Sequence, residues 1–132
     1  MVTLYKSSRE YVDLDFSFDR HPLTNNVTIK KSTNAIKQSI LHLLKLKTGD
    51  KPFHPEIRSP IYDYLFENAS VIVQVVLESE ILKYLNVYEP RIQVLEVKVS
   101  FPDNNSIKCN VIGNIVNMSE PFNVNILIER LR

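Results

Sequence analysis

The chain has 132 residues, of which 44% are hydrophobic, so it is long enough for one domain with a single core. Its net charge of +1 argues against a global attraction to nucleic acid or to a membrane. Two glycines, Gly49 and Gly113, lie too far apart to form a phosphate-binding loop. A single cysteine, Cys109, and three histidines without ligand spacing predict neither a disulfide framework nor a metal site, and no cofactor is expected.

The charges are unevenly distributed along the chain. Residues 30–58 carry seven Lys and Arg against two acids, whereas residues 59–132 carry six against nine. This pattern fits either an ordinary solvated helix and loop or a basic patch that faces an acidic protein partner. The N-terminus lacks the apolar segment of a signal peptide, and no apolar run reaches membrane-spanning length, so we expect synthesis in a cytoplasm-like compartment and no membrane partner.

The first half of the chain predicts a strand, a helix and a stiff loop. Residues 11–18 alternate Val12, Leu14, Phe16 and Phe18 with polar residues, which predicts a half-buried strand whose apolar side faces the core. Helical spacing follows from Ser32 or Thr33, either of which can cap the helix, to Gly49 as a plausible C′ residue. Residues 49–60 contain three prolines and predict an irregular connection.

The second half predicts two helices and three strands. A short helix follows Pro60, and a longer one runs from a Ser70 cap to Tyr88, although the β-branched residues 71–76 would also suit a strand. After Pro90 the period becomes two, and strands are expected over residues 92–99, 107–116 and 122–131. The predicted class is α+β, with helices packed on a small antiparallel or mixed sheet. It has a C-terminal β-meander and an N-terminal strand that can extend or cover it. Residues 1–28 are expected to form a strand or arm, and 29–132 a single globular domain.

Residue patterns for catalysis are weak. Glu56, Glu67 and Glu89 are candidates for an acid–base pair in glycoside hydrolysis, but no local motif singles out two of them and the chain has no Trp to stack on a sugar. No serine lies in a Gly-x-Ser-x-Gly turn, and Cys109 in an alternating strand is typical of a small buried residue. Lys30 and Lys31 lack the interleaved aromatics of a nucleic-acid site. We therefore expect no catalytic residues and no nucleic-acid partner.

Glu89, Pro90 and Arg91 form the clearest candidate for a binding site. Proline ends the helix and fixes its own φ, so the flanking side chains leave the backbone in defined directions. The planar guanidinium can then pair in bidentate fashion. Two interpretations remain open and can coexist: an intramolecular clasp from Arg91 to Glu67 or Glu56, and docking to another protein.

Three motifs follow one another in the chain: Gly49-x-Lys51-Pro52-Phe53-x-Pro55-Glu56, Leu65-Phe66-Glu67-Asn68 and Tyr88-Glu89-Pro90-Arg91-Ile92. In order and spacing, residues 30–130 resemble the small baseplate wedge, or sheath-initiator, family of T-even-type contractile phage tails, with relatives in type VI secretion baseplates. Arg58 departs from the glycine that relatives often carry there.

The resemblance implies a structural, non-catalytic protein of the virion tail baseplate, made in the host bacterial cytoplasm. It implies contacts with the core bundle of wedge proteins, with the tail sheath protein and possibly with tail tube or hub proteins. The first ring of sheath would be templated by β-augmentation at an exposed strand edge, offered by residues 122–131 or 12–18. The partner-binding residues it implies are Glu89, Pro90, Arg91, Phe53, Glu56, Phe66, Glu67, Asn123, Asn125 and Leu127.

Two alternatives come from other functional classes. Some relatives are labelled tail lysozymes, so a peptidoglycan-degrading enzyme is one, and a regulatory binding module on the same fold is the other. The sequence favours a phage over a secretion system or an extracellular injector without deciding between them.

Overall fold

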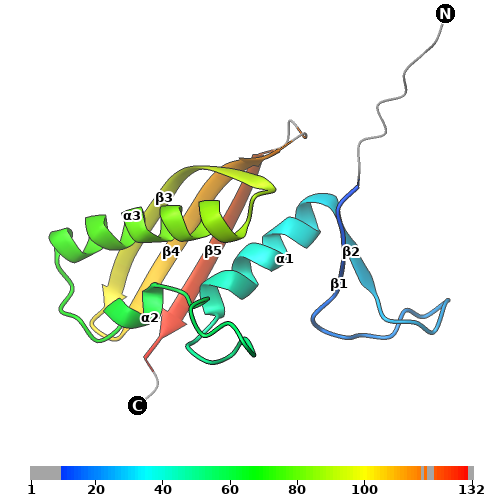
Figure 1. Cartoon of the computed structure of the whole chain (residues 1–132), viewed down its shortest axis with the longest axis horizontal. Coiled ribbons are helices and arrows are strands. Elements are labelled where there is room, and N and C mark those ends of the chain that lie inside the picture. The colour runs from blue at the N-terminus through cyan, green and yellow to red at the C-terminus, as the bar shows by residue number, and fades with distance from the viewer. Residues whose placement is uncertain (1–9, 117, 119–120, 131–132) are drawn as a thin grey trace, which may run out of the picture.

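The computed structural model describes residues 10–116, 118 and 121–130. Its main body is a three-stranded antiparallel sheet in the order β3-β4-β5, with two helices lying across one face (Figure 1). The strands are β3 (Ile92–Asp103), β4 (Ser106–Ile115) and β5 (Pro121–Glu129), and the helices are α1 (Ser32–Lys45) and α3 (Val71–Tyr88). The α+β class and the C-terminal meander are confirmed.

Two smaller elements flank this body. The short helix α2 (Ile61–Tyr64) and the loop before it lie at the end of the sheet where β5 finishes (Figure 1). At the other end, β1 (Val12–Leu14) and β2 (Ile29–Lys31) form a separate antiparallel hairpin next to the start of α1. The hairpin spans the boundary expected after residue 28, and the division of the chain there stays a prediction.

Strict alternation along the strands builds the core. In β5 every second residue is buried against the helices, namely Phe122, Val124, Ile126 and Ile128, and the residues between them are exposed. The register of β3 on β4 shifts between Val94 and Glu96, so Leu95 bulges outward and is exposed. Gly113 lies opposite this bulge, packed so closely against Phe122 that a β-carbon would stand 2.8 Å from its Cζ. A glycine is needed there because the sheet has no room for a side chain.

Helix α3 resolves the ambiguity of its β-branched start. Ser70 caps it by accepting a hydrogen bond from the Val73 amide at 3.2 Å. Its buried face holds Leu77, Ile81, Tyr84 and Leu85, and Tyr84 donates a hydrogen bond to the carbonyl of Leu43 in α1 at 3.0 Å. Helical capping and this buried stripe outweigh the strand propensity of the first turns.

Helix α1 is shorter than expected. It ends at Lys45, and Gly49 with φ +86° lies in a later turn, so its predicted role as C′ residue is wrong. The N-cap position is Lys31, whose side chain makes no capping hydrogen bond, rather than Ser32 or Thr33. The Ser59 amide donates to the Leu46 carbonyl at 2.9 Å, which closes the proline-containing loop between them.

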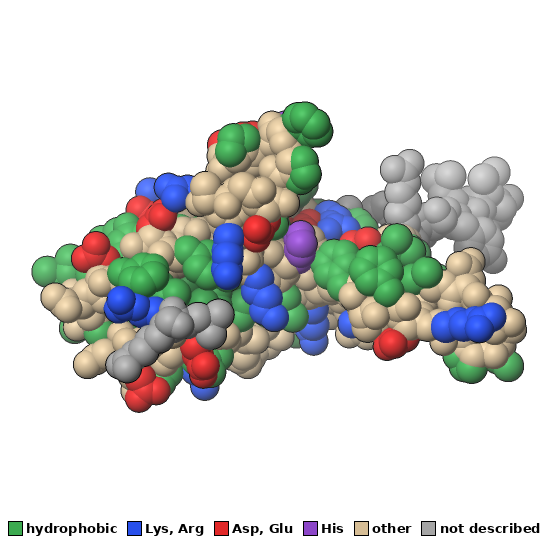
Figure 2. Space-filling model, turned by 90° about the horizontal axis from the view of Figure 1, so that it is seen from below, with side chains coloured by type: hydrophobic (Ala, Val, Ile, Leu, Met, Phe, Trp, Pro, Cys, Tyr) green, Lys and Arg blue, Asp and Glu red, His purple; other side chains and the backbone are tan. Residues whose placement is uncertain are grey.

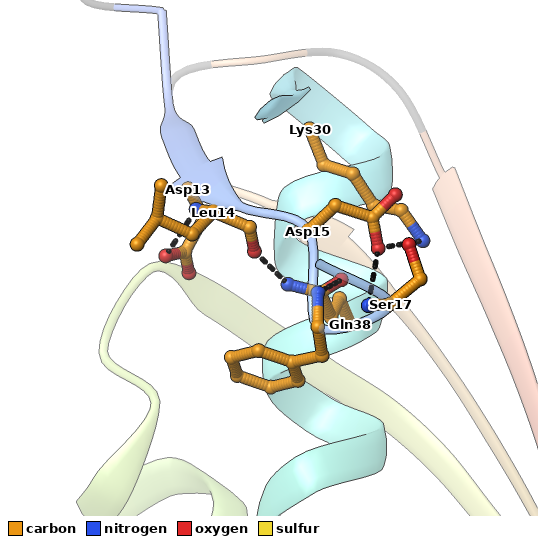
Figure 3. A network of polar contacts seen from close by, with 7 residues as sticks. Asp13, Leu14, Asp15, Ser17, Lys30 and Gln38 are labelled. Carbon is orange, nitrogen blue, oxygen red and sulfur yellow. Dashed lines mark hydrogen bonds and ion pairs between the residues drawn. The ribbon is translucent and has the colours of Figure 1, made fainter. Parts of the chain in front are cut away.

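The N-terminal hairpin corrects two further expectations. It joins no edge of the main sheet, and it is attached to α1 through Gln38 (Figure 3). Gln38 donates to the Leu14 carbonyl at 2.6 Å and accepts from the Phe16 amide at 3.2 Å. Asp15 pairs with Lys30 at 3.5 Å and accepts from the Ser17 amide at 3.1 Å. The neutral amide of Gln38 therefore attaches the hairpin to α1 through its backbone, and the Asp15–Lys30 pair connects parts of the hairpin segment itself.

The two faces of the hairpin are reversed relative to prediction. Val12, Leu14, Phe16 and Phe18 are exposed, whereas Asp13 and Asp15 are half-buried. Regular pairing also ends at Leu14, and Phe18 adopts a positive φ of 54°. The alternation in residues 11–18 shows that the two sides of the strand differ. Which side faces the body depends on the hydrogen bonds of Gln38 to the backbone of Leu14 and Phe16.

Candidate docking sites

The Glu89–Arg91 pair is built where α3 ends. The Glu89 amide still donates to the Leu85 carbonyl at 2.8 Å, and Pro90 then prevents another helical turn. Arg91 donates from Nε to Glu89 Oε1 at 2.6 Å and from Nη2 to Oε2 at 2.8 Å. Ser39 of α1 donates to the same Oε2 at 2.5 Å. The end of α3 is thereby tied both to the start of β3 and to α1.

Burial makes this pair more than a surface ion pair. The Glu89 side chain is 3% exposed and that of Arg91 is 30% exposed. Burial by itself raises the pKa of the Glu89 carboxyl, but hydrogen bonds from Arg91 and Ser39 and the guanidinium charge outweigh it, so the pKa lies below its ordinary value. Glu89 is therefore a charged, buried acceptor that fixes the direction of Arg91.

Part of the Arg91 guanidinium remains available to a partner. Two of its N–H groups bond Glu89, out of the five that an arginine carries. Its Cζ lies 5.6 Å from the centre of the Tyr11 ring, which covers it from the segment before β1. A planar cation, held by a buried carboxylate and partly exposed, is suited to bidentate pairing with a carboxylate.

The clasp exists, but its partner is not one of the two acids expected. Arg91 pairs with Glu89, whereas Glu56 accepts from His54 at 3.0 Å in the loop, and Glu67 is exposed just after α2. Figure 1 shows α2 and the end of α3 at opposite ends of the body. Arg91 pairs with Glu89 because Pro90, which lies between them, turns the chain so that their two side chains meet.

The other motif residues gather at the opposite end. Phe53 is 97% exposed and has a positive φ of 65°, an uncommon backbone conformation for a bulky residue. Phe66 is also exposed, and the Arg130 guanidinium carbon lies 4.4 Å from its ring centre. Through this contact the end of β5 meets the end of α2.

Pro90, by contrast, lies at the first end of the body, where it is exposed beside the Glu89–Arg91 pair.

Strand β5 forms one edge of the sheet. No further strand pairs with it among the described residues, and Asn123, Asn125 and Leu127 point away from the helices on its exposed face. An unpaired edge carries free backbone donors and acceptors that can receive another strand. Of the strand expected over 122–131, residue 131 lies outside the described residues.

The opposite edge, β3, is partly occupied. Glu78 of α3 accepts a hydrogen bond from the Val99 amide at 2.9 Å, and Gln74 donates to the same carboxylate oxygen at 3.2 Å. A helix side chain thus takes up a donor that an incoming strand would need. The two edges of the sheet are therefore chemically different.

The described residues place the catalytic candidates apart. Glu56, Glu67 and Glu89 each lie in a different environment, and Cys109 is buried in β4 with its pKa raised to about 12, by burial and then by the charge of Glu78. Within the described ranges, His, Cys, Asp and Glu form no group of three suited to a metal ion. None of the helices described is both long and apolar enough to cross a membrane.

Sequence reasoning missed Ser39, Tyr11 and Glu78. Ser39 and Tyr11 contact the Glu89–Arg91 pair only through tertiary packing, and no local sequence pattern predicts these contacts. Glu78 did carry a signal, because it lies four residues after Gln74 in α3, a spacing at which two side chains on one helix face can meet.

A small α+β domain with a fixed arginine at one end and an open strand edge is the kind of scaffold that binds other proteins. The family model of baseplate wedge protein gp25 matches residues 30–118, which is more than half of the chain. The chain belongs to this family of contractile-tail baseplate wedge proteins.

Individual relatives agree with this assignment. Over 65 residues the chain is 37% identical to baseplate wedge protein gp25 of Enterobacteria phage T4, and the match spans 49% of this chain and 49% of that protein. The match therefore spans about half the length of that curated relative.

Two solved structures share the fold. A putative tail lysozyme from Geobacter sulfurreducens superposes with a TM-score of 0.65 at 21% identity, over 74% of this chain and 89% of that one. A chain in the cryo-EM structure of the anti-feeding prophage baseplate superposes with a TM-score of 0.63 at 17% identity, over 93% of this chain and 88% of that one. At these identities the likeness establishes the shared α+β fold.

Proposed function

We propose that this baseplate wedge protein docks on the core bundle of the wedge through Glu89, Pro90 and Arg91, and that it starts the tail sheath by accepting a sheath strand at β5. In this role it acts in the virion tail without catalysis, after synthesis in the host bacterium. Residues 29–132 act as the wedge domain and residues 1–28 as an arm.

The buried Glu89 beneath a partly exposed Arg91 carries the docking proposal. A guanidinium that is already oriented loses little conformational entropy when it meets a carboxylate, so it favours one partner geometry. Its partner on the core bundle is then an Asp or Glu side chain, or a carbonyl at a helix C-terminus. Tyr11 and Pro90 flank the contact.

The sheath proposal depends on the difference between the two edges. Because Glu78 already occupies the Val99 amide of β3, the edge of β5 is the better acceptor for an incoming strand. Exposed Asn125 and Leu127 would contact side chains of that strand, and Phe66 with Arg130 lies at its far end. The N-terminal strand, which pairs with β2, is no longer a candidate edge of this sheet.

Coexpression with the wedge, tube and sheath proteins of the same tail tests both proposals. Arg91→Ala should remain monomeric and folded by circular dichroism but fail to enter wedges in size-exclusion chromatography. Asn125→Lys/Leu127→Lys should enter wedges but yield baseplates without sheath in negative-stain micrographs, since edge lysines resist strand addition.

The matched control places the same two charges on the other edge strand. Gln93→Lys/Ser100→Lys changes exposed residues of β3 and should leave sheath growth intact. If both lysine pairs permit normal sheath, strand addition at β5 is wrong. If both block it, added charge rather than the edge is the cause.

Peptidoglycan hydrolysis is the alternative suggested by the name of the Geobacter structure. The structural proposal predicts no clearing of peptidoglycan by the purified chain. Clearing that disappears in Glu56→Ala, Glu67→Ala or Glu89→Ala, with the fold retained, would replace it by the enzymatic function.

A further inference from the structure

A second hollow surface lies at the C-terminal end of α1, away from the Glu89–Arg91 pair. We call it the α1 groove; it has a volume of about 610 Å³ between the end of the helix and the loop that follows. Its lining combines apolar and basic side chains, chiefly Leu46, Pro52, Ile57, His42, Lys45 and Lys51. A groove of this size and mixed character is large enough for several side chains of a partner segment.

The lysines of the α1 groove outnumber the one acid in its lining, and hydrogen bonding, helped by the charge of Lys51, lowers the pKa of the Glu56 carboxyl. Neither Lys45 nor Lys51 takes part in an ion pair within the described residues. Asp50 also lines the groove, and its Oδ2 accepts a hydrogen bond from the Lys47 amide at 2.8 Å. That hydrogen bond leaves the charge of Asp50 in place, so the two lysines give the lining one positive charge in excess, which favours a ligand of opposite sign.

An exposed aromatic side chain continues the α1 groove toward the hairpin. The Phe16 ring centre lies 5.0 Å from that of His42, and Phe16 is 47% exposed. His42 and Lys45 are three residues apart in α1, so they share one side of the helix. Figure 2 shows one face of the molecule, on which a histidine lies between hydrophobic side chains and Lys or Arg side chains.

The hairpin, which reaches the α1 groove through Phe16, has an apolar side that remains about half exposed among the described residues. Leu14 and Phe18 are 52% and 65% exposed, whereas the carboxylate of Asp15 faces Lys30 on the covered side. A two-stranded hairpin is marginally stable alone, and exposing its apolar side makes it weaker still. This orientation favours a partner that covers the apolar side.

We propose that the α1 groove and the adjoining Phe16 bind an acidic amphipathic segment of another tail protein. Its apolar side chains enter the groove and cover Phe16, while its Asp or Glu side chains pair with Lys45 and Lys51. A protein segment fits better than a nucleic acid, because half of the residues that line the groove are apolar and none of them is an arginine that could offer a fork to a phosphate. The inference rests on the proposed function only in taking the partner from the same tail.

Two synthetic peptides test the charge and apolar requirements together. Both carry leucines at the same helical positions, and one has glutamates and the other lysines at the exposed positions. Fluorescence anisotropy with the full chain should show the glutamate peptide bound on the order of tenfold more tightly, with affinity falling as salt is raised. Peptides tiling the coassembled tail proteins should then be captured where acids and apolar residues alternate in helical register.

Variants separate the α1 groove from general charge effects. Lys45→Glu/Lys51→Glu should weaken binding on the order of tenfold, and Phe16→Ser should weaken it as well. The matched control, Lys83→Glu/Lys108→Glu, makes the same change in net charge at exposed sites elsewhere and should bind normally. Circular dichroism confirms that all variants remain folded.

Three results would overturn the inference. They are equal affinity for both peptides, equal loss of binding in the control variant, and a concentration-dependent dimer that Phe16→Ser dissolves, which would assign the surface to a second copy. A chain that enters wedges normally but binds neither peptide refutes this inference and leaves the proposed function standing. A wild-type chain that binds the glutamate peptide but enters no wedge refutes only the proposed function.

Discussion

Replacing Arg91 by alanine isolates the contribution of the buried ion pair to stability. The Glu89 carboxylate, 3% exposed, would lose the two hydrogen bonds from Arg91 and keep the one from Ser39. Removing one partner of a buried pair costs about 3–5 kcal/mol, and partial exposure of Arg91 with the retained Ser39 bond lowers our expectation to about 2–3 kcal/mol. Since domains are stable by about 5–15 kcal/mol, the variant stays folded, with its Tm lower by about 10 °C.

The loss of unfolding free energy in Arg91→Ala should depend on pH, and the direction of this dependence follows from the pKa of Glu89. In the wild type this pKa is depressed, so the pair stabilises the fold above the ordinary carboxyl pKa of about 4.3 and less as the pH falls below it. In Arg91→Ala, burial without the guanidinium raises the pKa, and protonation relieves the destabilisation as the pH falls through that raised value. The difference in unfolding free energy should therefore shrink between pH 7 and about pH 4.

Urea unfolding at several pH values, followed by circular dichroism, measures this difference. The control is Arg58→Ala, which breaks the exposed pair with Asp63 (2.9 Å) and should cost less than about 1 kcal/mol at any pH. A difference for Arg91→Ala that is below about 0.5 kcal/mol, or that does not change with pH, would refute the reasoning from burial.

Three further changes test other parts of the fold. Gly113→Ala should cost about 1–3 kcal/mol in urea unfolding, because the new methyl group meets the Phe122 ring and the backbone of β3; a neutral effect would mean that the sheet yields there. The thiol of Cys109 should react with iodoacetamide at pH 8 only as fast as the chain unfolds, since it is buried with a pKa near 12, and rapid labelling of the native protein would contradict that burial. Gln38→Ala should lose both bonds to the hairpin at a cost of about 1–3 kcal/mol, and hydrogen exchange should quicken at the hairpin amides while β4 stays protected; uniform exchange would argue against local attachment.

The elements best predicted from sequence are those with long, regular patterns and clear ends. The meander follows from period two after Pro90 and the turn at residues 102–105, and α3 follows from the Ser70 cap and the spacing of Leu77, Ile81 and Leu85. In both cases the local signals and the tertiary packing favour the same structure, so contacts with distant parts of the sequence do not change it.

The N-terminal segment and the details of the Glu89–Arg91 pair could not be read in the same way. Alternation in residues 11–18 shows two unlike faces but not which one meets the body, and that choice depends on Gln38, more than 20 residues away. Ser39 reaches Glu89 across 50 residues of sequence. Such contacts depend on how the helices pack against other elements, and this packing cannot be predicted from the pattern of a single sequence. The roles of the site residues in partner binding stay predictions.

The acceptor that Glu78 provides to Val99 has a consequence for solubility. A sheet with two open edges can join copies of itself edge to edge and grow into ribbons, particularly at the high local concentrations of an assembling particle. Here a carboxylate from the chain's own helix occupies a donor on one edge, which hinders head-to-tail joining of identical copies while β5 stays open. If β5 accepts a strand as proposed, this helix acid leaves that edge as the main one at which copies of the chain can join.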